Sequence, residues 1–456
     1  MTNHKPVKRI WLKQPLAMFS GTRVCDPLAT GGGLVVSGGR IVEFVAAGGA
    51  PAVAVDQVVD VSRHVVLPGL INTHHHFYQT MTRAHPDAIN KELFDWLKAL
   101  YPIWTRVTPD ALRLATRLAL VELMMSGVTT SSDHHYVYPS GLDDAMDIQA
   151  DEAGALGMRM TLNRGSMNLS VKDGGLPPES VVQDADTILA DCERVISKYH
   201  CTDEGAMTQV ALAPCSPFSV TQELMRDTAA LAKKCGCMLH THLAETRDED
   251  DFCMARFGMR PVDYLEECGW LTDKTWLAHG IYFNDDEIKR LGRAGVGVCH
   301  CPTSNMVLAS GHCRTRELEA AGVKVGLGVD GSASNDASNL MEGVRHALMI
   351  NRLTYDATVT HLDALRWATS GSAACLGRSD IGEIAIGKQA DLALFTLDEL
   401  RFSGAHDPLA ALVLCGAHRA DRVMIGGRWT VVDGLPVGVD LAALRHAHGE
   451  LAKSFA

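Results

Sequence analysis

The sequence has no apolar run long enough to cross a membrane, and it has no surplus of basic residues. Its most apolar late segment, residues 409–417, is far shorter than the roughly 18 residues that a membrane-spanning helix needs. Lysine and arginine number 42 against 54 aspartates and glutamates, which gives a formal net charge of -12. An acidic chain has no general attraction to phosphate backbones or anionic lipid surfaces. We therefore expect neither a nucleic-acid-binding protein nor a membrane protein.

The cysteines form no C-x-x-C pair, and there are 13 of them, whereas a disulfide framework usually has an even number. Such usage favours reduced thiols in the cytosol. The C-x-C pairs at 235/237 and 299/301 lie in strand-like runs, where buried free cysteine is a better interpretation than a zinc thiolate site. The N-terminus has basic residues but no apolar stretch of signal-peptide length, so we expect a soluble cytoplasmic protein.

Residues 66–377 alternate short β-branched runs with longer amphipathic helical patterns, which is typical of repeated βα units around a parallel sheet. Eight such units predict an α/β protein with a (β/α)8 barrel, in which active sites form at the carboxyl ends of the strands. The expected strands are residues 65–73, 127–132, 158–163, 209–213, 237–241, 275–278, 296–300 and 325–329.

The two flanks, residues 1–65 and 378–456, have a different pattern of short strands and glycine turns. The glycines at 31–33 lack the βαβ setting and the G-x-G-x-x-G order of a nucleotide loop. Neither flank alone has enough strands to bury a core. We therefore predict one small β-sandwich assembled from both chain ends, with a short helix at 440–454 closing the chain.

Histidine and carboxylate side chains follow several of the expected strands. His74 and His76 alternate along the first strand, so they project to the same face. His242 follows strand five, His279 follows strand six, and Asp330 follows strand eight. Because the carboxyl ends of barrel strands meet at one rim, these groups predict a site for one divalent ion, with zinc favoured and iron possible. His279 is either a ligand or a catalytic group.

Each of these residues also has an ordinary alternative role. A buried histidine is often part of the core, and an aspartate before a helix is a routine N-cap. A chance arrangement would need separate coincidences at four strands, all at the same end, so the metal site is the favoured interpretation. His134 and His135, after the second strand, are assigned to supporting or structural roles.

Several stretches resemble the amidohydrolase superfamily, and in particular its mononuclear deaminases and chlorohydrolases. They are PGLINTHHH at 68–76, HTHLAET at 240–246, LAHG at 277–280 and GVDGSASND at 328–336. FYQT at 77–80 and APCSPFS at 213–219 resemble the members of the group that act on 8-oxoguanine. The fourth strand ends in APCS and supplies neither a lysine nor a glutamate that could bridge two ions, so a single ion is expected.

The resemblance implies hydrolytic deamination of an amino-substituted purine base, with 8-oxoguanine and water giving urate and ammonia. The implied metal ligands are His74, His76, His242 and Asp330. Asp330 would also take the proton of the attacking water and pass it to the amine, while Glu245 would protonate the ring nitrogen beside the attacked carbon. His279 would hydrogen-bond the attacking group.

Substrate contacts are predicted from position alone. Gln79 lies after strand one, Arg164 ends strand three and Cys215 follows strand four, so all three are candidates to line the pocket. Arg164 is equally well explained as a surface residue or as a partner of a helix dipole. Trp96 and Trp104 offer a stacking face for a planar base, although core packing is the favoured interpretation.

Fold analogy does not separate the substrates that such a site can accept. Guanine, isocytosine and triazines are alternatives to 8-oxoguanine, the triazines with loss of chloride or of an amine. A non-catalytic barrel that acts as a scaffold is the alternative of another class, and the complete ligand set with Glu245 argues against it. The expected partner is a small heteroaromatic molecule, and a homo-oligomer is compatible with the exposed faces.

Overall fold

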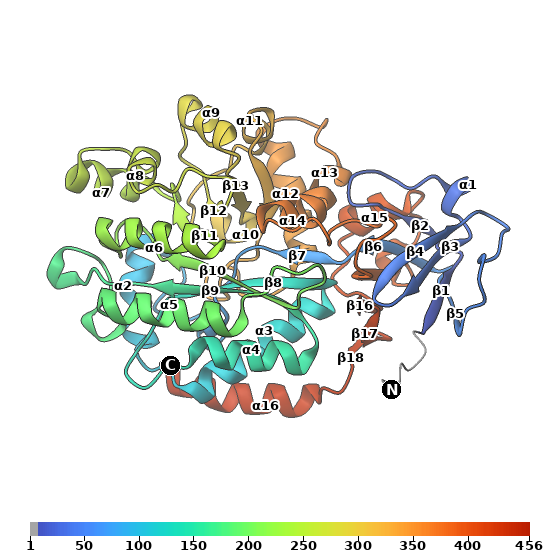
Figure 1. Cartoon of the computed structure of the whole chain (residues 1–456), viewed down its shortest axis with the longest axis horizontal. Coiled ribbons are helices and arrows are strands. Elements are labelled where there is room, and N and C mark those ends of the chain that lie inside the picture. The colour runs from blue at the N-terminus through green and yellow to red at the C-terminus, as the bar shows by residue number, and fades with distance from the viewer. Residues whose placement is uncertain (1–7) are drawn as a thin grey trace.

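The computed structural model describes residues 8–456, and its centre is a barrel of eight parallel strands (Figure 1). The strands follow one another in chain order around the sheet, as repeated βα units require. They are β7 (Leu70–Asn72), β8 (Val128–His135), β9 (Arg159–Ser166), β10 (Thr208–Pro214), β11 (Met238–Leu243), β12 (Thr275–His279), β13 (Gly297–His300) and β14 (Lys324–Leu327). Each coincides with or overlaps an expected strand.

Side-chain and backbone hydrogen bonds connect the first strand to the last. The backbone N–H of Thr73 donates to the carbonyl of Leu327 at 3.0 Å, and the Thr73 hydroxyl donates to the same carbonyl at 2.9 Å. One layer higher, the backbone N–H of Asp330 donates to the carbonyl of His74 at 3.1 Å. The two ends of the expected metal site are therefore held together by backbone.

Helices cover the outside of the barrel (Figure 1). The helix α6 (Gln222–Cys235) shows how the sequence sets their limits: the Thr221 side chain accepts a hydrogen bond from the Leu224 N–H, and Gly236 ends the helix with a left-handed φ of 74°. No helix in residues 8–456 has the length and apolarity to span a bilayer. The other helices are α1 (Pro27–Thr30), α2 (Leu93–Trp104), α3 (Pro109–Met125), α4 (Ala145–Leu156), α5 (Ala185–Tyr199), α7 (Arg247–Phe257), α8 (Pro261–Glu267), α9 (Asp285–Ala294), α10 (Pro302–Val307), α11 (Thr315–Ala320), α12 (Leu340–Thr354), α13 (His361–Arg366), α14 (Ser372–Cys375), α15 (Pro408–Leu414) and α16 (Leu441–Ala452).

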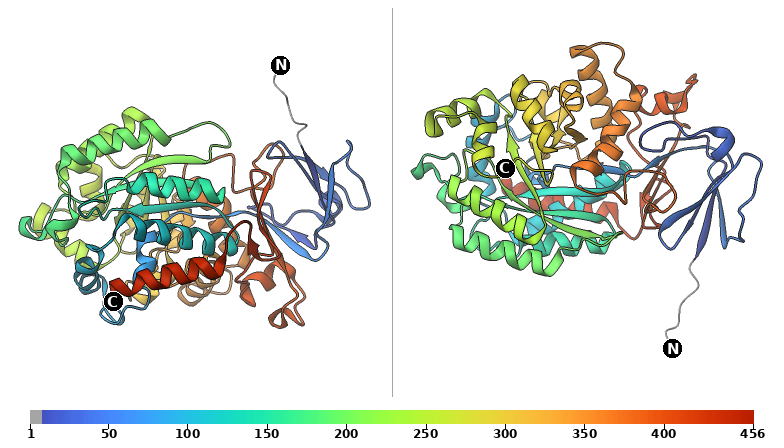
Figure 2. Two further views of the ribbon diagram at one scale, coloured as in Figure 1. Left: turned by 90° about the horizontal axis from the view of Figure 1, so that it is seen from below. Right: turned by 45° about the horizontal axis from the view of Figure 1, so that its top comes forward.

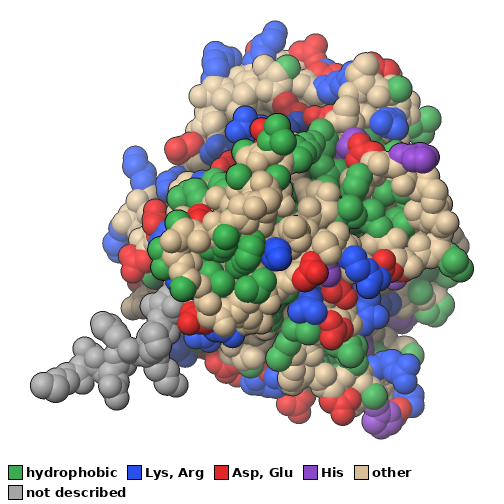
Figure 3. Space-filling view, turned by 90° about the vertical axis from the view of Figure 1, so that its right-hand side faces the viewer, with side chains coloured by type: hydrophobic (Ala, Val, Ile, Leu, Met, Phe, Trp, Pro, Cys, Tyr) green, Lys and Arg blue, Asp and Glu red, His purple; other side chains and the backbone are tan. Residues whose placement is uncertain are grey.

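Both chain ends build a small two-sheet domain beside the barrel (Figure 2). Leu12 and Val36 from one sheet pack with Val66, Leu392 and Met424 from the other. Lysine, arginine and acidic side chains are mixed across its outer face (Figure 3). The first sheet is β4 (Arg40–Val45), β3 (Gly33–Ser37), β1 (Arg9–Lys13) and β5 (Gln57–Asp60), and the second is β18 (Leu435–Pro436), β17 (Arg428–Val432), β16 (Arg422–Ile425), β15 (Leu392–Thr396), β6 (His64–Pro68) and β2 (Ala17–Met18). The predicted α/β barrel with a β-sandwich from both ends is confirmed.

The first expected barrel strand, residues 65–73, is divided between the two domains. Its first half is β6, which pairs antiparallel with β15 of the sandwich, and only β7 belongs to the barrel. Gly69 joins them where the chain passes close to β8: a Cβ added at this glycine would lie 2.1 Å from the Thr129 hydroxyl. The chain therefore enters the barrel at Gly69, slightly later than the expected boundary.

The closing helix α16 lies along α3 on the outside of the barrel rather than on the sandwich (Figure 2). Its His448 reaches the loop that follows the first barrel strand, where Nε2 lies 3.0 Å from the hydroxyl of Thr80. The chain end thus supports the turn η1 (Phe77–Thr82), which contains Gln79.

Candidate metal centre and active site

Five residues predicted from the sequence meet at the carboxyl ends of the barrel strands, and all are buried. His74 and His76 follow β7, His242 lies in β11, and His279 ends β12. Asp330, after β14, places one carboxylate oxygen 3.3 Å from His74 Nε2 and 3.2 Å from His76 Nε2. His242 Nε2 lies 3.2 Å from His76 Nε2. These atoms form a cluster with the spacing of a metal-binding site.

The backbone is in an unusual conformation next to this cluster. Ala244, His279 and Asp330 have φ values of 53°, 71° and 65°, in the left-handed region that non-glycine residues seldom adopt. Such conformations cost about 1–3 kcal/mol each and persist where the surroundings impose them, typically at functional sites. Here they redirect the chain at the ends of β11, β12 and β14, and this brings the side chains to one point.

Three of the imidazoles are oriented by an acceptor at Nδ1. Carbonyl and amide oxygens only accept, so each Nδ1 bears the proton and each Nε2 keeps its lone pair, directed at the centre. The pairs are His76 Nδ1 with the His134 carbonyl at 2.7 Å, His242 Nδ1 with the Cys215 carbonyl at 2.6 Å, and His279 Nδ1 with the Asn305 amide oxygen at 2.9 Å.

The donor set fits one divalent cation. His74 Nε2 is buried and has no hydrogen-bond partner among the described residues. The lone pairs of His76 and His242 face each other at 3.2 Å, an arrangement that a shared cation relieves. Neutral imidazoles and a carboxylate are ligands that zinc prefers, and they also suit iron. Burial favours the neutral form of His242, because it lowers the pKa of that imidazole to about 3.

Glu245 lies beside the cluster, with a carboxyl oxygen 3.4 Å from His279 Nε2. Burial, and next the charge of Asp330, raise its pKa well above the usual range. This shift favours the protonated carboxyl group, which can donate a proton. Glu249 fixes the turn, since its carboxylate accepts the backbone N–H groups of Ala244 at 2.9 Å and Glu245 at 3.2 Å.

A narrow pocket with largely apolar walls opens onto the cluster. Gln79 and Cys215 line it, as predicted, and the Gln79 side-chain nitrogen is buried without a hydrogen-bond partner in the described part of the chain. Of the two tryptophans, Trp96 lines the pocket and Trp104 is buried in the core. The remaining lining residues are His76, Leu93, Leu97, Tyr101, Tyr136, Phe218, His242, Glu245, His279, Leu308, Asp330 and Ser334.

Comparison with known proteins agrees with the geometry. The sequence pattern of the amidohydrolase family matches residues 65–430. The chain belongs to the amidohydrolase family. This amidohydrolase is 61% identical over 449 residues to the 8-oxoguanine deaminase of Pseudomonas aeruginosa, and the alignment covers 98% of this chain and 99% of that protein. It is 37% identical over 400 residues to the hydroxydechloroatrazine ethylaminohydrolase of a Pseudomonas species, over 86% of this chain and 83% of that protein.

A solved structure has the same fold. The atrazine chlorohydrolase from Arthrobacter aurescens TC1, determined as a complex with zinc, matches this amidohydrolase with a TM-score of 0.90 and 29% identity, over 97% of this chain and 100% of that chain. The family predicted from the sequence is therefore confirmed.

Arg164 is not part of the amidohydrolase pocket, which corrects the expectation that it contacts the substrate. Its side chain leaves β9 toward the helix layer, where it donates to Asp191 at 2.6 Å and to Gln183 at 2.8 Å, and its guanidinium lies 4.0 Å from the centre of the Tyr138 ring. Its neighbour Asn163 donates to Ser132 of the adjacent strand. Successive strand residues point to opposite faces, so the strand end alone did not show which face Arg164 takes.

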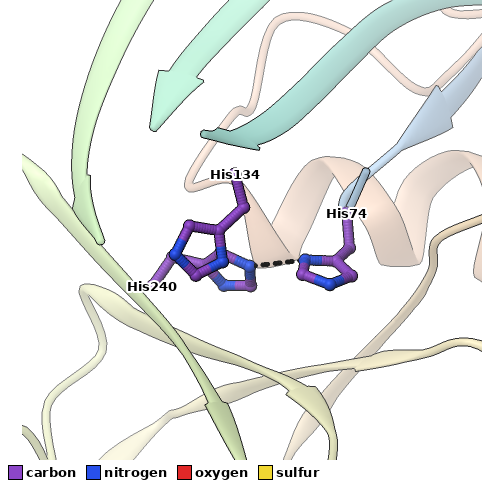
Figure 4. Close-up of side chains that lie close together, drawn as sticks. All are labelled: His74, His134 and His240. Carbon is purple, nitrogen blue, oxygen red and sulfur yellow. Dashed lines mark hydrogen bonds between the residues drawn. The ribbon is translucent and has the colours of Figure 1, made fainter. Parts of the chain in front are cut away.

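Sequence reasoning assigned no role to His240, which lies directly behind the centre. His240 Nε2 is 2.8 Å from His74 Nδ1 (Figure 4). One signal was present in the sequence: His240 and His242 repeat the H-x-H spacing of His74 and His76 on a second strand, so His240 shares the face of His242.

Proposed function

We propose that the chain is a metal-dependent hydrolase that deaminates a purine base, with 8-oxoguanine and water giving urate and ammonia. The observation that carries the proposal is the buried Glu245 carboxyl group, which lies beside a histidine and carboxylate cluster in a pocket lined by aromatic side chains. The 61% identity to a protein named 8-oxoguanine deaminase, over nearly the whole of both chains, supports the substrate.

The residues placed to hold the ion are His74, His76, His242 and Asp330. A divalent ion held there, for which we propose zinc, would lower the pKa of a water molecule and so supply a nucleophile near neutral pH. The zinc complex of the related chlorohydrolase supports that choice of metal. One oxygen of Asp330 faces the histidines, while the other lies 3.7 Å from His279 Nε2. Asp330 is thus placed to accept a proton from the attacking water and to return it to the departing amine.

Glu245 and His279 act on the other reacting groups. Attack on a heteroaromatic ring breaks its aromaticity, which raises the barrier to the reaction. Protonation of the adjacent ring nitrogen by Glu245 lowers that barrier and accelerates the attack by roughly 100- to 10,000-fold. Asn305 holds the proton of His279 on Nδ1, so Nε2 faces Glu245 and Asp330 as an acceptor for the water. The apolar pocket walls exclude bulk water from these proton transfers.

Recognition of the base falls to the polar groups of the pocket. The unpartnered Gln79 amide is positioned to donate to a ring carbonyl, and Cys215 lines the pocket beside the His242 ligand. Burial raises the pKa of the Cys215 thiol to about 12, so it stays neutral and acts by packing rather than as a nucleophile.

The substrate is tested by ammonia release from zinc-loaded protein with 8-oxoguanine, guanine, isocytosine and aminotriazines. We expect kcat/KM for 8-oxoguanine to stand far above the others. Glu245→Gln should reduce kcat by roughly 100- to 10,000-fold with unchanged zinc content, whereas the exposed control Glu223→Gln should match wild type. A higher kcat/KM for another base contradicts the substrate, and an active Glu245→Gln contradicts the proton-transfer role.

A further inference from the structure

A second group of histidine nitrogens lies behind the proposed metal centre, on the far side of the His74 ring. His74, His134 and His240 each place one nitrogen within 4.8 Å of the other two (Figure 4). They come from three strands that are separated in sequence: β7 leads into His74, β8 contains His134, and β11 contains His240. All three are fully buried. The mechanism proposed above uses only His74.

Backbone carbonyls define which nitrogen bears the proton in two of these rings. His240 Nδ1 lies 2.9 Å from the Trp276 carbonyl, and His134 Nε2 lies 2.8 Å from the Ala213 carbonyl. A carbonyl only accepts, so these nitrogens donate, and burial favours the neutral rings. The lone pairs are left on His134 Nδ1 and on His240 Nε2, and the latter lies 2.8 Å from His74 Nδ1.

We propose that His240 is a positioning residue that fixes the tautomer of His74, with His134 supporting it. The His240 lone pair accepts the proton of His74 Nδ1 at 2.8 Å, and this bond leaves the His74 Nε2 lone pair directed at the metal site. His134 Nδ1 is buried without a hydrogen-bond partner in the described residues, and one nitrogen of its ring lies within 4.8 Å of a nitrogen of His74 and of His240. The proposal rests on the metal site of the proposed function.

The surroundings hold His240 in this orientation. Its ring stacks on Trp276, with centres 4.4 Å apart and an angle of 16° between the planes. The Trp276 indole N–H in turn donates to the carbonyl of Thr73, the residue before His74, at 3.1 Å. Strand β11 thus supplies one ligand, His242, and two residues earlier the group that orients another.

Zinc affinity distinguishes this role from simple core packing. Phenylalanine at position 240 keeps a flat ring for the stack on Trp276 but removes the acceptor, whereas glutamine restores an oxygen that accepts from His74. The zinc dissociation constants of apo wild type, His240→Phe, His240→Gln and the control His346→Phe are measured by competition with a chromophoric chelator. His346 is a half-buried histidine that contacts Thr303, away from the pocket lining.

We expect His240→Phe to bind zinc roughly 10- to 100-fold more weakly than wild type, His240→Gln to recover most of that loss, and His346→Phe to match wild type. Equal zinc dissociation constants for His240→Phe and His240→Gln overturn the proposal, even if both variants are less stable than wild type. The two variants differ in whether residue 240 offers an acceptor to His74, so a loss common to both reflects packing alone. In the cobalt(II)-loaded proteins, the absorption spectrum should differ most from wild type in His240→Phe, less in His240→Gln and not at all in His346→Phe. A wild type that binds no zinc contradicts the metal centre itself, and that result is distinct from the failure of the His240 role.

Discussion

Gly331, next to the proposed ligand Asp330, determines the position of the Gln79 side chain. A Cβ added at Gly331 would lie 1.8 Å from Gln79 Oε1, whereas ordinary contacts begin at 3.4 Å. In Gly331→Ala the Gln79 side-chain amide must therefore move by about 1.6 Å. The amide moves rather than the backbone, because it ends a flexible side chain, whereas the backbone N–H of Asp330 is hydrogen-bonded to the His74 carbonyl. This movement removes the Gln79 N–H from the place where a substrate carbonyl would meet it.

Loss of one such hydrogen bond costs about 0.5–1.5 kcal/mol, which corresponds to roughly a 2- to 12-fold fall in kcat/KM. We expect Gly331→Ala to raise KM for 8-oxoguanine by such a factor with unchanged zinc content. Gly154→Ala is the matched control, because Gly154 lies in α4, is exposed and has nothing within 4 Å of the added Cβ. That variant should keep full activity and melt at the same or a higher temperature.

A double-mutant cycle with Gln79→Ala identifies the path of the effect. If Gly331→Ala acts through Gln79, it has no further effect on kcat/KM in a protein that already carries Gln79→Ala. An equal loss in both backgrounds would show that the methyl group acts on Asp330 instead. A Gly331→Ala protein with wild-type kcat/KM would refute the reasoning altogether.

Two further predictions concern stability. Arg164→Gln should leave KM for 8-oxoguanine unchanged but lower the melting temperature, because it removes a charged hydrogen bond to the part-buried Asp191 that is worth about 1.5–3 kcal/mol. A large rise in KM with unchanged stability would return Arg164 to the pocket. Burial raises the pKa of Asp380, but hydrogen bonds from Arg378 and from the Gly205 N–H outweigh it and lower that pKa to about 2. The ionised Asp380 therefore stabilises the folded state by about 2 kcal/mol, fully above the unfolded pKa near 3.8, and this contribution is lost as the pH falls through 2. The difference in melting temperature between wild type and Asp380→Asn should narrow from pH 7 to pH 3. A difference that stays constant contradicts this assignment.

Periodicity along the chain was sufficient to predict the barrel and the grouping of most of the histidine and carboxylate side chains at the proposed metal site. Strand side chains alternate between two faces, and barrel strands end at one rim, so the positions of His74, His76, His242 and Asp330 already placed them together. The alternation of β-branched and helical segments likewise predicted eight units, and the short strands of the two flanks predicted a domain built from both chain ends. These are properties that each segment expresses locally, without knowledge of its neighbours.

Tertiary structure decided which atoms meet across strands. The sequence placed Arg164 at a strand end but could not show that it turns outward to Asp191, and it contained no sign that Gly331 makes room for Gln79. Nor could spacing show that His240 reaches His74 from 166 residues away, because that contact depends on the order and register of the whole sheet. Local patterns determine which side chains share a face of one element, whereas the direction of that face and the partners it meets depend on how the barrel aligns every strand.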